Sequence, residues 1–248
     1  MVRALLVSDL HYDLRKLDWV LAEAEGVDLL AVAGDILDIG SGVPLDAQIV
    51  VALEYLARFA ERTTTVACSG NHDLDSRNDA DEKTTRWITE ARRSGVHVDG
   101  DTLEVGGWLV TACAWWEGPD TLSSLQASLD AAAEQRHGPW LWVYHGPPEG
   151  PLAWTGSKFY GDPELPQLLD RHHPEVVLCG HIHQAPFVAG GAWYDRHGSS
   201  MLFNSGYQRG NIPAHTFLDL DESTASWWST AGEGDVSFAG SAAAAAPQ

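Results

Sequence analysis

The stretch Leu29-Leu30-Ala31-Val32-Ala33-Gly34-Asp35-Ile36-Leu37-Asp38 places an acidic turn directly after a continuous apolar run. Such a run, closed by a glycine, is typical of a strand that is buried on both faces of a sheet. A carboxylate at the mouth of a buried strand is costly unless it is ionised beside a cation or extensively hydrogen-bonded. We therefore interpret Asp35 as a metal ligand, and more specifically as a carboxylate that bridges two metal ions.

The pattern of a buried strand followed by polar side chains recurs along the chain. Strands are expected over residues 3–8, 28–33, 64–68, 141–144 and 176–179, with a hairpin over 102–105 and 108–110 and amphipathic helices between most of the strands. Strands too apolar to have a solvated face indicate mostly parallel sheets that are covered by helices. The fold class that we predict is α/β, a four-layer α-β-β-α sandwich of two mixed sheets flanked by helices. The order of the strands stays open.

The length of 248 residues suits one large domain. We assign residues 1–231 to that domain and interpret residues 232–248, which are rich in small side chains, as a low-complexity, disordered tail without a core. No apolar run approaches the roughly 20 residues that cross a bilayer. The first residues lack the pattern of a signal peptide, so a cytoplasmic location is expected.

Charge and cysteine content narrow the function. The formal net charge is -20 with only 15 Lys and Arg residues, so the field of the protein repels nucleic acid polymers and anionic membranes. A phosphate-bearing substrate would need local cations, which metal ions could supply. Cys68, Cys113 and Cys179 lie singly inside apolar runs and are expected to be buried thiols rather than zinc ligands or disulfides.

Polar residues at the expected strand ends form the candidate site. In parallel sheets, ligands bind beyond the carboxyl ends of the strands. Oxygen and imidazole ligands in mixture suit manganese, iron, zinc or cobalt, and the lack of thiolates favours an open catalytic site over a structural zinc site. The residues are Asp9, His11, Asp35, Asn71, His72, Asp73, His145, His181 and His183.

Five short motifs in this set resemble the calcineurin-like metallophosphoesterase superfamily. Its signature blocks are Asp-x-His, Gly-Asp-x-x-Asp, Gly-Asn-His-Asp, a single His after a strand, and Gly-His-x-His. In this sequence they stand as Asp9-Leu10-His11, Gly34-Asp35-Ile36-Leu37-Asp38, Gly70-Asn71-His72-Asp73, His145, and Gly180-His181-Ile182-His183. Ser205 replaces the proline that the family usually carries in a later Asn-Pro-Gly block.

The resemblance implies a site with two divalent metal ions, manganese, iron or zinc, that share Asp35. One ion would be held by Asp9, His11, Asp35 and His183. The other would be held by Asp35, Asn71, His145 and His181. A hydroxide shared between the ions would be the nucleophile that attacks phosphorus.

The same resemblance implies roles for residues beside the ligands. His72 would donate a hydrogen bond or a proton to the phosphate or to the leaving oxygen, and Asn71 would also contact the substrate. Asp73 would orient the His72 ring and keep it protonated. For Asp38 two interpretations stay open, a supporting or loop-capping role and a solvated surface acid.

The Gly- and Pro-rich loop over residues 147–163 leaves a strand that bears a ligand, so we expect it to overhang the metals. We predict that Trp154 and Lys158 bind the substrate, although Lys158 could equally be an exposed lysine on a mobile loop. Trp115 and Trp116, at the end of another strand, could supply a stacking wall for a nucleobase or another flat group.

Together these residues predict an enzyme, a metal-dependent phosphoric ester hydrolase that acts on small-molecule phosphodiesters, with nucleotides among the candidates. The alternatives are a phosphomonoesterase or protein phosphatase with the same site and, more remotely, a non-catalytic metal-binding scaffold. The sequence does not identify the substrate, the native metals or the oligomeric state.

Overall fold

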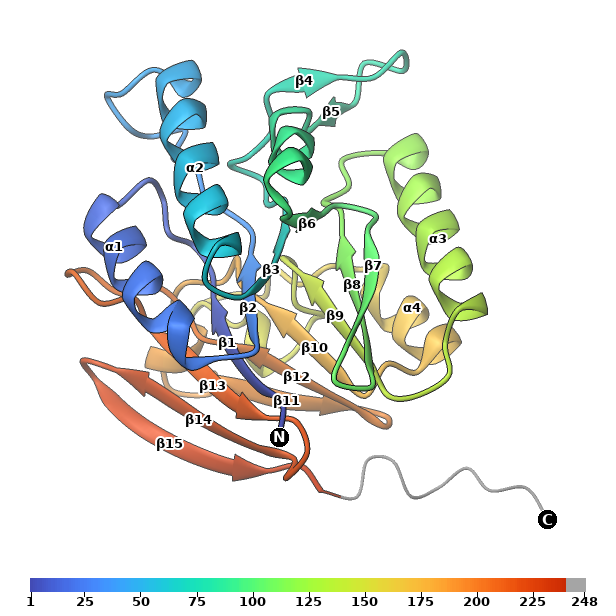
Figure 1. Cartoon of the computed structure of the whole chain (residues 1–248). Coiled ribbons are helices and arrows are strands. Elements are labelled where there is room, and N and C mark those ends of the chain that lie inside the picture. Colours follow the sequence, from blue (N-terminus) through green and yellow to red (C-terminus); the bar gives the residue numbers. More distant parts are fainter. Residues whose placement is uncertain (240–248) are drawn as a thin grey trace.

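Two β-sheets lie face to face in the computed structural model, which describes residues 1–239 (Figure 1). The first sheet has the order β15-β14-β13-β1-β2-β3-β6 and the second has the order β11-β12-β10-β9-β8-β7. The first contains β1 (Arg3–Val7), β2 (Leu29–Ala33), β3 (Thr64–Cys68), β6 (His97–Val98), β13 (His215–Asp219), β14 (Thr224–Ser229) and β15 (Gly232–Ser237). The second contains β7 (Thr102–Val105), β8 (Trp108–Cys113), β9 (Trp140–Tyr144), β10 (Val176–Cys179), β11 (Tyr194–His197) and β12 (Ser200–Asn204).

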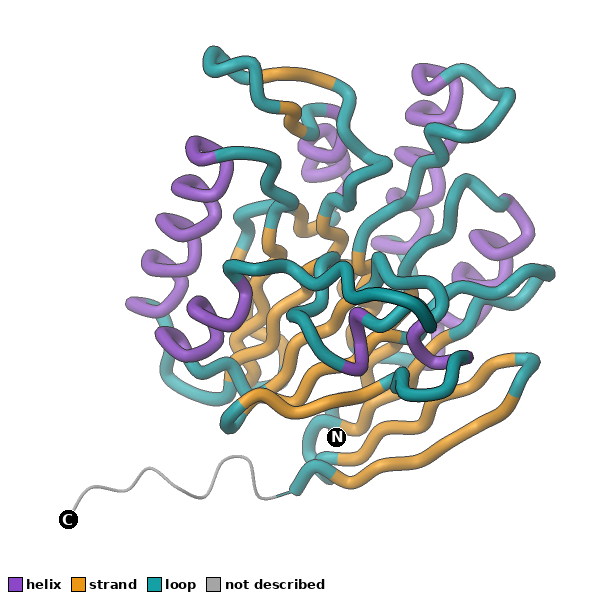
Figure 2. Tube along the Cα trace, turned by 180° about the vertical axis from the view of Figure 1, so that it is seen from behind, coloured by secondary structure: helices purple, strands orange, loops and turns teal. Residues whose placement is uncertain are grey.

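Helices cover the outer face of each sheet, as the apolar strands require. Figure 1 shows α1 and α2 on one side of the molecule and α3 and α4 on the other, and Figure 2 shows the strands between them from behind. The helices are α1 (Leu14–Glu23), α2 (Leu45–Ala60), α3 (Pro119–Glu134) and α4 (Leu165–His172). Shorter 3-10 turns are η1 (Ala24–Gly26), η2 (Trp87–Ser94), η3 (Pro151–Ala153) and η4 (Ala185–Phe187). The predicted four-layer α-β-β-α sandwich of two mixed sheets is confirmed.

The buried side chains follow this layering. One cluster lies between the sheets and includes Leu6, Ala31, Val143 and Phe203. A second fills the space between the first sheet and helices α1, α2 and η2, and a third lies between the second sheet and helices α3 and α4. The strand alternation therefore sends successive side chains into two different cores, which explains why almost every residue of these strands is apolar.

The centre of each sheet is parallel, and this directs the polar turns to one edge. β1 pairs with β2, β2 with β3, β8 with β9, and β9 with β10 in parallel register. Antiparallel strands occur toward the margins, where β13 pairs with β1 and β7 with β8. The carboxyl ends of β1, β2 and β3 are therefore neighbours, and so are those of β9 and β10.

Two expectations from the sequence need correction. The charged stretch over residues 74–95 is expected to be loop and helix, but it contains a small hairpin of β4 (Ser76–Arg77) and β5 (Lys83–Thr84) before the 3-10 helix η2. The composition places the start of the tail at residue 232, yet β15 pairs along its length with β14, and Phe238 is 1% exposed against Phe203.

The tail boundary is misplaced because β15 is an edge strand. Most of its residues are small or charged and face solvent, while Val236 packs against the core between the sheets. The part of the expected tail over residues 240–248 lies outside the described residues. Within residues 1–239, no helix combines the length and the apolar character that crossing a membrane demands.

Candidate metal centre

The seven predicted ligands come from turns that follow five strands. Asp9 and His11 follow β1, and Asp35 follows β2. Asn71 lies after β3, and three histidines follow β9 and β10 of the other sheet. The structure brings six of them together in two groups, Asp9 with His11 and His183, and Asp35 with His145 and His181. Each group therefore draws side chains from both sheets.

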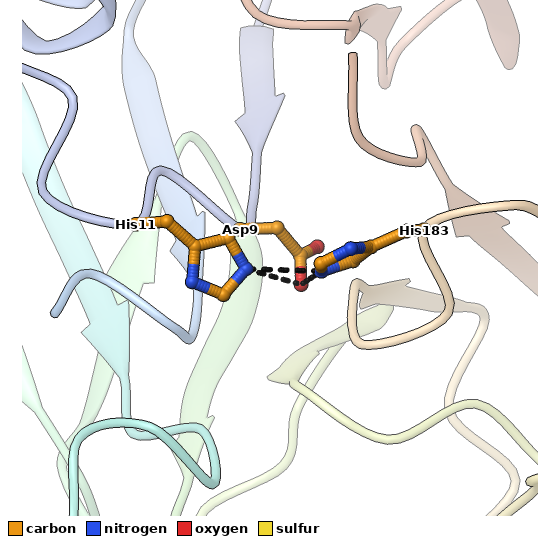
Figure 3. Close-up of side chains that lie close together, drawn as sticks. All are labelled: Asp9, His11 and His183. Carbon is orange, nitrogen blue, oxygen red and sulfur yellow. Dashed lines mark hydrogen bonds and ion pairs between the residues drawn. The ribbon is translucent and has the colours of Figure 1, made fainter. Parts of the chain in front are cut away.

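In the first group, two imidazoles and a carboxylate converge on one point (Figure 3). Nε2 of His11 lies 2.9 Å from Nε2 of His183, and Oδ1 of Asp9 lies 3.2 Å from the same His183 atom. Ser8 donates its hydroxyl to Asp9 Oδ2 at 2.6 Å, and the backbone N–H of His181 also donates to this carboxylate. Asp9 is thus held so that Oδ1 faces the imidazoles.

The second group has its own orienting contacts. His145 donates Nδ1–H to the carbonyl oxygen of Ala33 at 2.8 Å, which directs Nε2 into the site. That Nε2 lies 3.3 Å from Asp35 Oδ2 and 3.3 Å from Asn71 Oδ1. Asn71 therefore joins this group, as the sequence predicts, and Asp35 Oδ1 accepts the N–H of His72 at 2.8 Å.

Backbone strain and two glycines allow these turns to meet. Asp9, Asp35 and His181 have φ values of 53°, 52° and 69°, in the left-handed region that side chains with a Cβ rarely adopt. A Cβ on Gly34, where φ is 79°, would lie 2.4 Å from His145 Nδ1. A Cβ on Gly70 would lie 2.3 Å from Asp35 Oδ1, so only glycine permits this approach.

Protonation at the site reflects burial and close opposite charges. Burial opposes ionisation of both Asp9 and Asp35. The hydrogen bond with His183 nevertheless lowers the pKa of Asp9 below the ordinary range for Asp, and the charge of His145 does the same for Asp35. Burial also disfavours charge on His145, yet the Asp35 carboxylate raises its pKa to about 9. Burial and the neighbouring His145 lower the pKa of His181 to about 4.

The donor sets fit divalent metal ions. In each group the ligand atoms lie within 4.8 Å of one another, and they are carboxylate oxygen and imidazole nitrogen without thiolate. Two imidazole Nε2 atoms 2.9 Å apart, beside the Oδ1 atom of a buried carboxylate, present three donor atoms close enough together to bind one divalent cation. Burial lowers the pKa of His11, and the carboxylates of Asp9 and Asp35 oppose that shift.

His72 lies beside the first group, but its neighbours differ from those predicted. Its ring packs edge-on against His11, with 4.6 Å between the ring centres. His72 Nδ1 accepts the N–H of Ile39 at 3.4 Å and lies 3.8 Å from Asp38 Oδ1. Asp38, and not Asp73, is thus the carboxylate beside His72, and His11, Asp38 and His72 form a further cluster of possible ligand atoms.

The prediction that Asp73 orients the His72 ring is wrong. The Asp73 side chain is 0% exposed and turns inward, where it accepts the backbone N–H groups of Ile36, Leu37 and Gly70 at 2.8–3.0 Å. It therefore ties the turn after β3 to the acidic turn after β2. Burial and the nearby Asp35 charge raise the pKa of Asp73 to about 7.

A cavity of about 230 Å³ adjoins the second group and is lined by Trp115, Trp116, Gly146, Tyr160, Gly161, Asp162, Pro163 and His181. The structure does not bring Trp154 and Lys158 to this cavity. Trp154 donates Nε1–H to the carbonyl of Ala189 and packs on Phe159, and Lys158 lies over the Tyr160 ring. The predicted wall of Trp115 and Trp116 is present.

Tyr160 and Asp162 are cavity residues that the sequence analysis did not identify. Their position in the loop over residues 147–163 was the available signal, but the loop contains several aromatic residues and its path decides which of them faces the site. That path is set by Asp162, whose backbone N–H donates to the carbonyl of Pro147 and whose side chain accepts from the Trp116 indole and from the backbone N–H of Glu164.

Comparison with known proteins agrees with this geometry. The model of the calcineurin-like phosphoesterase family matches residues 2–185, and the chain belongs to this family of metal-dependent hydrolases acting on phosphoric esters. The structure of TT1561 of Thermus thermophilus matches with a TM-score of 0.60 and 17% identity, covering 96% of this chain and 99% of that chain. GAP50, the anchor in the inner membrane complex of Plasmodium, matches with a TM-score of 0.51 and 9% identity, covering 91% and 84%.

At these identities the two solved structures show the fold alone. No match was found among curated proteins.

Proposed function

We propose that this protein hydrolyses small-molecule phosphodiesters with the help of two divalent metal ions, of the manganese, iron or zinc type. The observation that carries the proposal is the convergence of two carboxylate and imidazole groups from both sheets, with His72 in contact with the first of them. The absence of thiolates from both groups favours a catalytic over a structural site.

The proposed ions would be held by Asp9, His11 and His183 in one group and by Asn71, His145 and His181 in the other, with Asp35 shared. When bound, such a pair supplies Lewis-acid stabilisation of the phosphoryl oxygens and lowers the pKa of a bound water. The chain itself supplies the orientation of the ligands through Ser8, the Ala33 carbonyl and the backbone of the strained turns.

His72 is suited to act on the leaving oxygen. Because Nδ1 accepts the N–H of Ile39, the neutral ring carries its proton on Nε2, where it can be donated. Asp38 lies on the Nδ1 side of the ring, with its Oδ1 atom 3.8 Å from that nitrogen. In this proposal His72 donates to the oxygen that departs from phosphorus.

The size and charge of the substrate follow from the whole protein. The net charge of -20 disfavours polynucleotides, so the metal centre must provide the positive charge that binds a small phosphate ester. The adjoining cavity of about 230 Å³ has room for one substituent of a small ester rather than for a folded protein surface.

A screen of metals against substrates tests the proposal. Purified protein depleted of metal and then loaded with manganese, iron or zinc is assayed on aryl monoesters, aryl diesters and cyclic nucleotides. We expect hydrolysis with at least one metal and a higher kcat/KM for diesters. Preference for monoesters would replace the diester proposal by a phosphomonoesterase, and binding of metal without any hydrolysis would favour a non-catalytic scaffold.

Two substitutions separate the roles of metal binding and proton donation. Asp35→Asn should weaken metal binding and lower kcat by about 100-fold or more, because shared or oriented ligands typically contribute effects of this order. His72→Ala should keep the metals and lower kcat by about 100-fold for poor leaving groups, but much less for p-nitrophenolate, which needs no proton. Metal content is measured by atomic emission and rates by product release. Equal loss on good and poor leaving groups would contradict the role of His72.

A further inference from the structure

The walls of the cavity beside the second metal group are largely aromatic, and their rings are held in place. Trp115 donates Nε1–H to Glu117 at 2.8 Å and its backbone N–H to Ser69 at 3.0 Å. Trp116 donates Nε1–H to Asp162 at 2.9 Å. Both indole N–H groups are thus satisfied by protein acceptors, and both rings are fixed before any ligand binds.

The carboxylate in the cavity wall is already occupied. Asp162 is 9% exposed and accepts from the Trp116 indole, the Tyr144 hydroxyl and the backbone N–H groups of Glu164 and Leu165. Among residues 1–239, neither lysine nor arginine lines the cavity. The aromatic walls therefore favour an uncharged flat ring, which would stack on them, over a second phosphate or a carboxylate.

The cavity and His72 contact different ends of the metal centre. The Trp115 ring centre lies 5.1 Å from that of His181 and 5.4 Å from that of His145, both in the second group. The His72 ring packs on His11, in the first group. If His72 donates its proton to the leaving oxygen, the cavity lies on the opposite side. It then adjoins the substituent whose ester oxygen stays bound to phosphorus.

We propose that this cavity receives a flat, uncharged ring on the substituent that remains on the phosphate, so that ring-bearing phosphodiesters are the preferred substrates. The inference rests on the proposed function and gives a reason for the preference for diesters, because a monoester has no second substituent to fill the cavity. The ring could belong to a nucleoside or to a simple aryl group.

A series of p-nitrophenyl esters with the same leaving group tests this placement. The retained substituent is phenyl, thymidine 5′-yl, methyl or absent. In each reaction water adds its oxygen to phosphorus, the bond to p-nitrophenolate breaks with its electron pair, and the retained ester stays intact. Because the retained groups also change intrinsic reactivity, the informative quantity is the ratio of kcat/KM between variant and wild type for each substrate.

Tyr160 and Phe159 provide a matched pair of variants. They are neighbours on one loop with exposed fractions of 50% and 47%, but only Tyr160 lines the cavity. Tyr160→Ala should lower kcat/KM for the phenyl ester by about tenfold, the order expected when one stacking contact is removed. The methyl ester and the monoester should change less than about twofold by the same reasoning. Phe159→Ala should leave all four substrates unchanged.

The thymidine ester distinguishes the two sources of the ring. A loss shared by the phenyl and thymidine esters supports a cavity for any flat ring, and a loss confined to one of them assigns the cavity to that source. An equal loss on all four substrates would place the leaving group in the cavity and overturn the inference, as would no loss on any of them.

A binding measurement separates this inference from the proposed function. If wild type loaded in turn with manganese, iron and zinc hydrolyses no ester, the proposed function fails. The cavity is then tested by titration calorimetry with methyl phenyl phosphate and dimethyl phosphate. Tighter binding of the phenyl compound that Tyr160→Ala removes would support the cavity, and equal affinities would refute it.

Discussion

Lys16, on helix α1, is a charged side chain with an exposed fraction of only 1%. Its Nζ lies 3.7 Å from the centre of the Tyr207 ring, and that ring stacks on His183 with 4.8 Å between centres. Burial lowers the pKa of Lys16 to about 8, against the attraction of Asp13 and Asp9. Burying this ammonium group on folding therefore costs desolvation free energy, which the cation–π contact with Tyr207 offsets in part.

The lowered pKa of Lys16 predicts a specific dependence of stability on pH. Between pH 8 and 10.5 the unfolded chain binds more protons at this site than the folded protein, so the free energy of unfolding rises with pH. Lys16→Met should lack this rise, which amounts to at most about 1.4 kcal/mol per pH unit. Urea unfolding of both proteins in chelator at pH 7.5, 9 and 10.5 measures the difference. Parallel curves would contradict the assignment.

The predicted ligands that the structure brings together share one property. Asp9, His11, Asp35, His145 and the Gly-His-x-His histidines directly follow buried strands, so their position at the sheet edge depends only on strand assignment. The orientation of the Asp73 side chain could not be predicted from strand assignment, because it depends on how two turns with left-handed residues pack together. Tyr160 was missed for a similar reason. A long irregular loop has no repeating pattern that predicts which of its side chains face the site.

At the scale of elements, Arg136 joins the ends of several elements of the second half of the molecule. It follows helix α3 and donates to the carbonyl oxygens of His172 and His173 at the end of helix α4. Its guanidinium also pairs with Glu175 at 2.7 Å, and Glu175 accepts the N–H of Trp140 at the start of β9. Two helices and the strand region between them are thus connected through one side chain.

This connection predicts unequal effects for two arginine substitutions. Arg136→Met should lower the free energy of unfolding by about 2 kcal/mol, because it leaves partly buried carbonyls and a carboxylate without their charged donor. Arg171→Met removes an exposed pair with Asp130, with exposed fractions of 57% and 44%, and should change the free energy of unfolding by less than about 1 kcal/mol. Urea unfolding of both variants measures this, and similar values would contradict the argument.

Most of the elements could be predicted because their apolar patterns are strong. The helices over 14–23 and 45–60 and the central strands of both sheets follow directly from hydrophobic period and from glycine boundaries. β15 could not, because an edge strand whose residues largely face solvent has almost the composition of a polar loop. Its assignment depends on its partner β14, which is information that a local pattern does not contain.

At the scale of the whole molecule, each metal group connects the two sheets. Asp9, His11 and Asp35 come from the first sheet, whereas His145, His181 and His183 come from the second. Elsewhere the two sheets meet mainly through apolar side chains, among them Leu6, Ala31 and Val143. The candidate ligands are thus a polar link at one edge of a largely apolar contact.

This link has a consequence for the rates at which the protein folds and unfolds. Neither group of ligands exists until the two sheets have docked, so a metal can be bound in full only after the main barrier to folding. Manganese should therefore slow unfolding in proportion to its stabilising effect and leave the refolding rate almost unchanged. Stopped-flow unfolding and refolding with manganese and with chelator measures both rates. If manganese instead accelerated refolding by the same factor as it slowed unfolding, the two sheets would have to meet first at the metal centre.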